Sequence, residues 1–233
     1  MKPAFKLVVF DIAGTTIQDN DGVAGIFMYA MEQHGYPVDL EQASRIMGYK
    51  KNIAIEILLQ DNYPVALAKN RSIIAAIHTT FNSEMVEYYK REKIEAMPGA
   101  EKTFIWLKEN NIKVALNTGF SKIVTDTLLK KVDWCGVGFI DYAISSDEVG
   151  SGRPAPDMIQ QIMKATGVYD AKAVVKVGDT EVDIAEGRAA GCGLVVSVTT
   201  GSFTREQLFT YQPDIIIDDL NELPSLIKPV TLA

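Results

Sequence analysis

The sequence predicts an α/β fold with a mostly parallel sheet and a helical insertion after the first strand. Short apolar runs rich in β-branched residues alternate with segments of helical period along most of the chain. The runs are apolar almost throughout, as expected of strands that are covered on both faces. Between the first run and the next lie about a hundred residues at helical period without a convincing strand.

The predicted strands are residues 6–10, 113–117, 142–145, 174–177, 194–198 and 214–218. Helices are predicted between them at 100–110, 121–132, 156–165 and 182–190. Gly191 follows the last of these helices, at a position where a helix C-terminus commonly has glycine. This alternation is typical of a sheet whose parallel strands are joined by helices.

The insertion is predicted to consist of helices at 24–34, 40–47, 53–59 and 65–93. Met97-Pro98-Gly99 marks the return to the α/β pattern, because proline and glycine interrupt regular structure. We therefore expect two domains: a split core of residues 1–16 and 95–233, and a helical cap of residues 17–94.

Composition limits the function. The 233 residues are 47% hydrophobic and carry 23 basic and 30 acidic residues, a net charge of −7, which argues against a nucleic-acid partner. Apolar runs such as 7–10 are far shorter than the roughly 20 residues that span a bilayer. Two cysteines, Cys135 and Cys192, fit a reducing compartment. We expect a soluble cytoplasmic protein without a membrane partner.

The first candidate motif, Asp11-Ile12-Ala13-Gly14-Thr15-Thr16, follows the first predicted strand. A carboxylate at the C-terminal end of a parallel strand points into the crevice where open α/β sheets bind ligands. The glycine allows a tight turn, and hydroxyl and N–H groups such as those of Thr15 can hold an anion. The alternative is an ordinary strand-to-turn connection.

Two further motifs also lie near strand ends. Asn117-Thr118-Gly119 combines a hydroxyl with a glycine amide before a helix, which favours an anion site but also fits a simple N-cap. Arg153 lies in Gly150-Ser151-Gly152-Arg153-Pro154-Ala155-Pro156, a loop stiffened by prolines. Its planar guanidinium suits phosphoryl oxygens, although most single arginines are only solvated.

The fourth motif, Gly178-Asp179-Thr180-Glu181-Val182-Asp183, follows the predicted strand 174–177. Asp179 and Asp183 are four residues apart on a strand-to-helix turn, so both can face one site as the hard oxygen ligands that Mg²⁺ prefers. Acidic residues are also favoured at a helix N-terminus by the helix dipole, and that alternative stays open.

Together, and in this order, the motifs resemble the haloacid dehalogenase superfamily of aspartate-nucleophile phosphotransferases over essentially the whole chain. That family has a Rossmann-like core with a cap inserted after strand one. The resemblance implies that Asp11 is the nucleophile and that Mg²⁺ is held by Asp11, the Ala13 carbonyl and Asp179. It also implies that Asp183 supports the metal through water or hydrogen bonds.

By the same resemblance Thr118 binds the phosphoryl group, and Arg153 stands where most members have a lysine. Most phosphatases of the superfamily carry a second Asp two positions after the nucleophile, where this chain has Ala13. Ala13 cannot protonate a leaving alkoxide, and loss of such help costs something like 10²–10⁴ in rate. The leaving group is therefore expected to differ from an ordinary alkoxide.

Met47-Gly48-Tyr49-Lys50-Lys51 in the predicted cap, with the Asp11 and Arg153 motifs, resembles the phosphonoacetaldehyde hydrolase (phosphonatase) family. The resemblance implies that Lys51 forms a Schiff base with the substrate carbonyl, so that carbon leaves phosphorus as an enamine without an acid at Ala13. Lys50 is the competing amine. Adjacent helical residues point about 100° apart, so only one of the pair is expected in the site.

The chain departs from phosphonatase at three places. Ala54 stands where that family has a His, Phe120 stands where it has a Tyr, and residues 18–22 differ. We therefore expect a phosphonatase-like, Mg²⁺-dependent hydrolase that cleaves a small aldehyde or keto phosphonate. The alternatives are a phosphate-ester phosphatase, similar to phosphoglycolate phosphatase or a sugar-phosphate mutase, and a catalytically silent phosphate-ligand binder. A homodimer through the cap is an expectation of the family.

Overall fold

The computed structural model describes residues 5–19 and 21–227. Within these residues six strands form one parallel sheet in the order β3-β2-β1-β4-β5-β6. The strands are β1 (Leu7–Phe10), β2 (Lys113–Thr118), β3 (Tyr142–Ser145), β4 (Val174–Gly178), β5 (Leu194–Val198) and β6 (Ile215–Ile217). The predicted strands are confirmed to within one residue at each end.

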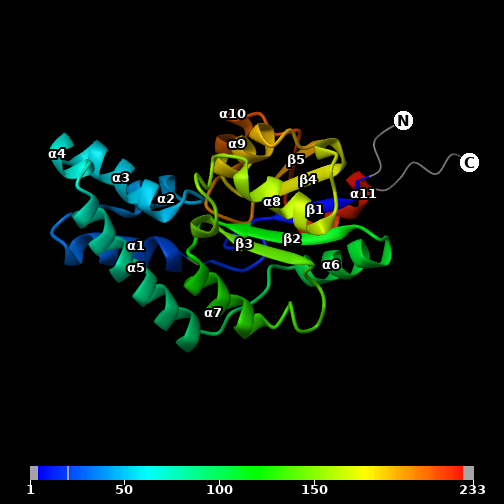
Figure 1. Cartoon of the computed structure of the whole chain (residues 1–233), viewed down its shortest axis with the longest axis horizontal. Coiled ribbons are helices and arrows are strands. Elements are labelled where there is room, and N and C mark those ends of the chain that lie inside the picture. The colour runs from blue at the N-terminus through cyan, green and yellow to red at the C-terminus, as the bar shows by residue number, and fades with distance from the viewer. Residues whose placement is uncertain (1–4, 20, 228–233) are drawn as a thin grey trace, which may run out of the picture.

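Helices cover both faces of this sheet (Figure 1). They are α6 (Ala100–Glu109), α7 (Lys122–Val132), α8 (Asp157–Thr166), α9 (Glu181–Ala189), α10 (Arg205–Thr210) and α11 (Leu223–Ile227). The first four correspond to predicted helices. The sequence analysis did not predict α10 or α11, because both are too short to show a clear helical period.

The sheet separates two apolar cores, because successive side chains of a strand point to opposite faces. Val8 and Phe10 of β1 pack with α6, α7 and the helices of the insertion. Leu7 and Val9 of the same strand pack with α8, α9 and α10. The central strand is therefore buried on both faces, which explains why its sequence is apolar at every position.

The insertion forms a helical unit of α1 (Gly22–Gln33), α2 (Leu40–Arg45), α3 (Lys51–Asn62), α4 (Val65–Ala68) and α5 (Arg71–Arg91), which lies at one end of the molecule (Figure 1). The single helix predicted over 65–93 is wrong. The chain breaks after α4, and Asn70 starts α5 by accepting hydrogen bonds from the N–H groups of Ser72 and Ile73 at 3.1 and 3.3 Å. Such an N-cap stabilises a new helix start.

The two connections between the helical unit and the sheet run side by side. Gln18 N donates to Glu95 O at 3.0 Å, and Met97 N donates to Thr16 O at 2.8 Å. Helix α5 of the unit also packs against α7. The division into a core of 1–16 and 95–233 and a cap of 17–94 remains a prediction, and it extends at both termini beyond the described residues. No helix in residues 5–19 and 21–227 has both the length and the apolar character needed to cross a membrane.

The strand order places a crevice at the carboxyl ends of β1, β2 and β4. The chain continues from β1 to β2 and β3 on one side of β1, and then crosses to β4, β5 and β6 on its other side. Doubly wound sheets bind ligands at this reversal of the strand order, which is called the switch point. Three of the four motifs predicted from the sequence lie at the ends of these strands, and the Arg153 loop follows β3. The helical unit lies beyond one end of the sheet, with α2 nearer to the sheet than α4 (Figure 1).

Candidate active site

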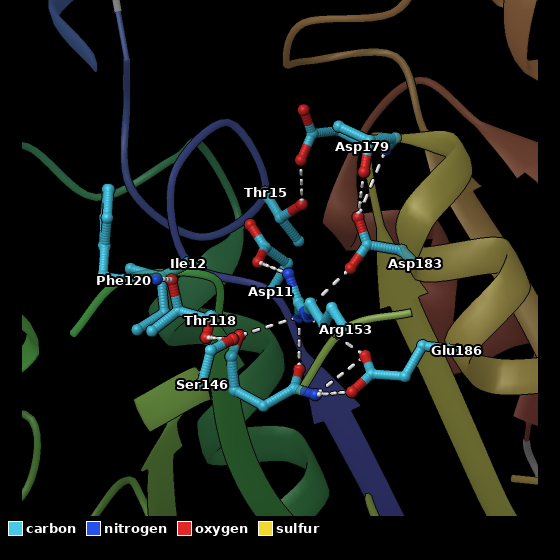
Figure 2. A network of polar contacts seen from close by, with 12 residues as sticks. Asp11, Ile12, Thr15, Thr118, Phe120, Ser146, Arg153, Asp179, Asp183 and Glu186 are labelled. Carbon is cyan, nitrogen blue, oxygen red and sulfur yellow. Dashed lines mark hydrogen bonds and ion pairs between the residues drawn. The ribbon is translucent and has the colours of Figure 1, made fainter. Parts of the chain in front are cut away.

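Asp11 lies directly after β1 and is 5% exposed. Its Oδ1 forms an ion pair with Nη1 of Arg153 at 2.5 Å, and the arginine is fully buried (Figure 2). Among the described residues, Arg153 is the donor to the Asp11 carboxylate, and Oδ2 accepts no hydrogen bond from them. The sequence predicted both residues, and the fold joins them across 142 positions of the chain.

Arg153 is held by more partners than the sequence analysis identified. Its Nε donates to Glu186 Oε2 at 3.1 Å, and its Nη2 donates to the Asn117 carbonyl and side-chain oxygens at 2.9 and 2.6 Å. Nη2 also lies 3.2 Å from Asp183 Oδ1. Every nitrogen of the guanidinium therefore has an oxygen partner, as a charge buried this deeply requires.

Lys176 completes this network and is a residue that the sequence analysis missed. Its Nζ lies 2.9 Å from Asp183 Oδ1 and donates to Asn117 Oδ1 at 2.8 Å, and it is fully buried in β4. Asp183 Oδ1 forms ion pairs with Lys176 and Arg153, but it accepts no hydrogen bond from either of them. The signal in the sequence was a lysine within an otherwise apolar strand, since such a charge must find partners in the fold.

The network sets opposite pKa shifts on its members. Burial tends to raise the pKa of Asp183, but Lys176 and Arg153 lower it below its usual value. Burial tends to lower the pKa of Arg153, but Asp183, Glu186 and Asp11 raise it above its usual value. For Asp11 burial prevails over Arg153 and raises the pKa to about 6. The ion pairs thus keep Arg153 and Asp183 charged.

Asp179 begins the turn after β4 and is 1% exposed. Its Oδ1 accepts from Thr15 Oγ1 at 2.8 Å, and its Oδ2 accepts from Ser202 N at 2.8 Å. A Cβ on Gly14 or Gly201 would lie 2.8 or 2.0 Å from Oδ2, so both glycines are needed for the backbone to approach this carboxylate. Burial, with the nearby charges of Asp11 and Asp183, raises the pKa of Asp179 well above its usual value.

These carboxylates suit a divalent cation. Asp11 and Asp179 are buried hard-oxygen donors whose mutual repulsion a cation would relieve, and Mg²⁺ binds through one or two carboxylates while keeping several waters. Among the described residues no three His, Cys, Asp or Glu side chains are grouped so that they could hold a metal together. Asp183 faces Lys176, Arg153 and Thr180, so its support of a metal would be indirect.

Thr118 and Gly119 lie at the end of β2, beside Asp11 across the sheet. Thr118 Oγ1 accepts from Phe120 N at 3.2 Å, which leaves its own proton free to donate to an anion. Ser146 Oγ, also missed by the sequence analysis, donates to the Thr118 carbonyl at 2.9 Å and fixes this turn (Figure 2). A Cβ on Gly119 would lie 2.3 Å from the Tyr49 carbonyl, so this glycine allows the helical unit to approach the sheet.

Lys51 is the first residue of α3 and is only 3% exposed. Its Nζ lies 5.2 Å from the Phe120 ring centroid and 5.9 Å from that of Phe81, and it donates to the Tyr49 carbonyl at 3.4 Å. No carboxylate of a described residue forms an ion pair with it. Burial lowers the pKa of Lys51 to about 8, with Asp11 acting in the opposite direction and Arg153 in the same direction.

Lys50 has a different environment. Its Nζ donates to the Val149 and Gly150 carbonyls at 3.3 and 3.2 Å, on the loop that leads to Arg153. Only Lys51 of the pair is enclosed beside the aromatic rings. Ala54 is fully buried and Ala13 is partly buried, and neither carries a side chain able to transfer a proton. Within residues 18–22, Asn20 lies outside the described part of the chain.

The fold and this polar crevice place the protein among hydrolases built on a Rossmann-like sheet. The chain belongs to the haloacid dehalogenase-like hydrolases, whose family model matches residues 5–191. It is 30% identical to a phosphonoacetaldehyde hydrolase from Bordetella avium over 255 residues, covering 97% of this chain and 90% of that protein.

Solved structures confirm the fold. The chain superposes with a TM-score of 0.85 on a phosphonoacetaldehyde hydrolase-like protein from Oleispira antarctica, covering 97% of this chain and 92% of that one at 24% identity. A predicted phosphoglycolate phosphatase from Haemophilus somnus gives a TM-score of 0.76 at 18% identity, covering 97% of this chain and 99% of that one. At these identities the structures establish the fold alone.

Proposed function

We propose that this hydrolase is Mg²⁺-dependent and cleaves the carbon–phosphorus bond of a small aldehyde or keto phosphonate through an aspartyl-phosphate at Asp11 and an imine at Lys51. One observation carries the proposal. Lys51 is a buried amine without a carboxylate ion pair among the described residues, and it is near enough to Asp11 for the charge of that residue to affect its pKa. A lysine amine is activated for carbonyl chemistry when desolvation lowers its pKa.

The chemistry balances with the residues present. The Lys51 amine adds to the substrate carbonyl, water leaves, and a protonated imine forms. Oδ2 of Asp11 then attacks phosphorus, and the electrons of the breaking C–P bond move into the imine to give an enamine. A proton returns to the enamine carbon, and one water hydrolyses the imine. A second water hydrolyses the aspartyl-phosphate, which releases phosphate and restores Asp11.

The other groups support these steps. Arg153 holds Oδ1 of Asp11, so that Oδ2 faces the phosphorus. Thr15, Thr118 and the Gly119 amide are proposed to bind the phosphoryl oxygens. Mg²⁺, held by Asp11, Asp179 and the Ala13 carbonyl, would supply charge that offsets the phosphoryl oxygens. Ala13 is compatible with this reaction because no alkoxide leaves.

The helical unit is proposed to act as the cap, because it supplies Lys51 to a crevice formed by the sheet. The approach of the Gly48 and Tyr49 carbonyls to Gly119 supports this role. A cytoplasmic location and a homodimer through the cap, as in the family, remain part of the proposal. Sedimentation equilibrium tests the dimer.

Borohydride trapping tests the mechanism. Phosphonoacetaldehyde with borohydride should reduce the imine to a secondary amine, and peptide mapping should place it on Lys51. Lys51→Arg keeps the charge but cannot form the imine at neutral pH, so phosphonate turnover should be lost while slow hydrolysis of an aryl phosphate remains. Lys50→Arg is the matched control and should keep phosphonate turnover.

Other outcomes select the alternatives. A label on Lys50 instead of Lys51 would show that Lys50 forms the imine. Efficient hydrolysis of phosphate esters without any label would favour the phosphatase. The absence of turnover of both phosphonates and aryl phosphates would favour a silent binder of phosphate ligands.

A further inference from the structure

A cavity of about 530 Å³ lies beyond Lys51, between the helical unit and the loops that follow β2 and β3. Its walls are the start of α3, one face of α5, and the turn that carries Phe120. Pockets of this size bind drug-sized ligands. The organic part of a two-carbon aldehyde occupies only about two or three water volumes, roughly 60–90 Å³. The cavity therefore has room for a much larger group on the carbonyl carbon.

Helix α5 gives the order of groups along this cavity. Phe81, whose ring lies near the Lys51 amine, is followed toward the N-terminus of α5 by His78, then Ile74, then Arg71. At 1.5 Å per residue, His78 lies about 4.5 Å and Arg71 about 15 Å from Phe81 along the helix axis. A chain that extends from the imine carbon along α5 would meet His78 first and Arg71 last.

The charges of the cavity wall do not cancel. Lys50, Lys51 and Arg71 face Glu56 and Asp147. The Lys50 amine is bound by two neutral carbonyl groups, and Arg71 forms no ion pair with any residue among 5–19 and 21–227. The wall therefore carries one more positive than negative charge, although the net charge of the whole protein is −7. A ligand group with a single negative charge would complement this wall.

His78 is oriented by a chain of hydrogen bonds. Ser121 Oγ donates to Asn82 Oδ1 at 2.9 Å, which turns the Asn82 amide nitrogen toward His78 Nε2 at 3.4 Å. Nε2 then accepts, and Nδ1 carries the proton of the neutral ring. Burial and the Lys51 and Lys50 charges lower the pKa of His78, with Asp147 acting in the opposite direction, so the ring is neutral at pH 7.

We infer that the substrate is a β-keto phosphonate, not an aldehyde, whose carbonyl carbon carries an extended chain that ends in a carboxylate and is long enough to reach the Arg71 end of the cavity. His78 donates a hydrogen bond to that chain, and Arg71 pairs with the carboxylate. This inference rests on the proposed imine at Lys51 and adds the substrate class of the same site.

Three probes test it: 8-oxo-9-phosphononanoate, whose chain is long enough to extend from the imine toward Arg71, its methyl ester at the carboxylate, and phosphonoacetaldehyde. The wild type should release phosphate from the acid with a kcat/KM about tenfold above that of the ester, with the difference in KM. Arg71 is exposed, so Arg71→Gln should reduce this preference roughly twofold to fivefold, the range that an exposed ion pair gives. Arg71→Lys should restore part of it. Arg91→Gln, at the exposed other end of α5, is the matched control and should leave the preference unchanged.

Equal kcat/KM values for the acid and the ester in the wild type would overturn the inference. So would an Arg71→Gln variant that keeps the full preference for the acid. Trapping separates this failure from that of the proposed function. If borohydride labels Lys51 with the aldehyde but the acid has no advantage, only the inference fails. If none of the three probes gives a label, the imine mechanism itself fails.

Discussion

The amine of Lys51 lies 5.2 Å from the centre of the Phe120 ring, although the two residues come from the helical unit and from the turn after β2. The aromatic face attracts a cation, while burial among Phe120, Phe81 and α3 removes the water that would otherwise solvate it. Burial prevails, and the pKa falls to about 8. The contact between the two units therefore creates an amine that is partly neutral near physiological pH.

The first prediction concerns this amine. Because the pKa of Lys51 is below its usual value, the neutral form is favoured, and a pKa of about 8 leaves roughly a tenth of the amine neutral at pH 7. Its acetylation rate by trace acetic anhydride should rise about tenfold per pH unit up to pH 8 and then level off. Mass spectrometry of the peptide measures it, and Lys51→Arg is the control that should lack this profile. A rate that still rises steeply above pH 9.5 would show an ordinary amine.

The second prediction concerns Asp11. Asp11→Asn should reduce turnover by about 10³-fold or more, because an amide cannot replace the nucleophile of a covalent mechanism. Beryllofluoride should inhibit the wild type by mimicking the acyl phosphate. Turnover is measured by phosphate release, and Asp126→Asn, on the exposed face of α7, serves as the control. An Asp11→Asn enzyme with most of its activity would rule out the aspartyl-phosphate.

The third prediction concerns the metal. Asp179→Asn should weaken Mg²⁺ binding at least tenfold in titration calorimetry, because it removes a charged hard-oxygen ligand. Asp183→Asn should weaken it less, since this carboxylate faces Lys176 and Arg153. Exhaustive chelation should abolish turnover of the wild type, and added Mg²⁺ should restore it. Full activity of the chelated enzyme would contradict the proposed cofactor.

The fourth prediction concerns stability. Arg153→Met leaves Asp11, Asp183 and Glu186 buried without this cation, so it should lower the free energy of unfolding in urea by about 3–5 kcal/mol. The matched control is Arg188→Met, which removes a half-exposed pair with Asp214 and should cost about 0–1 kcal/mol. Similar losses for the two variants would mean that the buried network does not stabilise the fold as argued.

The fifth prediction concerns Ala13. Ala13→Asp adds a group able to protonate a leaving alkoxide, so hydrolysis of alkyl phosphate esters should rise at least tenfold, up to the 10²–10⁴ that a well-placed general acid supplies. Ala13→Asn has nearly the same shape without the acid and should give no such gain. Initial rates with an alkyl phosphate measure the effect, and equal rates for the two variants would exclude general-acid help at this position.

The regular elements of the sheet could be predicted from local sequence. Strand β5 has the predicted bounds, because a strand buried on both faces needs a largely apolar run that the chain displays directly. The helix predicted over 65–93 failed for a local reason. The Asn70 side chain provides an N-cap, and that interaction starts a new helix without interrupting the helical period.

By itself, the sequence determined the fold class and the order of the motifs, and it singled out Asp11, Arg153, Asp179 and Asp183 as candidate site residues, because these depend on strand ends and local turns. It left Lys50 and Lys51 as alternatives. It also identified no partner for Lys176. This lysine contacts Asn117, which is distant in sequence, and Asp183, which lies on the helix after its own strand. The tertiary structure decided these points, because burial and ion pairing are set by which segments pack together. Packing brings Phe120 and Phe81 around one lysine and backbone carbonyls to the other, and this gives two adjacent, identical side chains different surroundings.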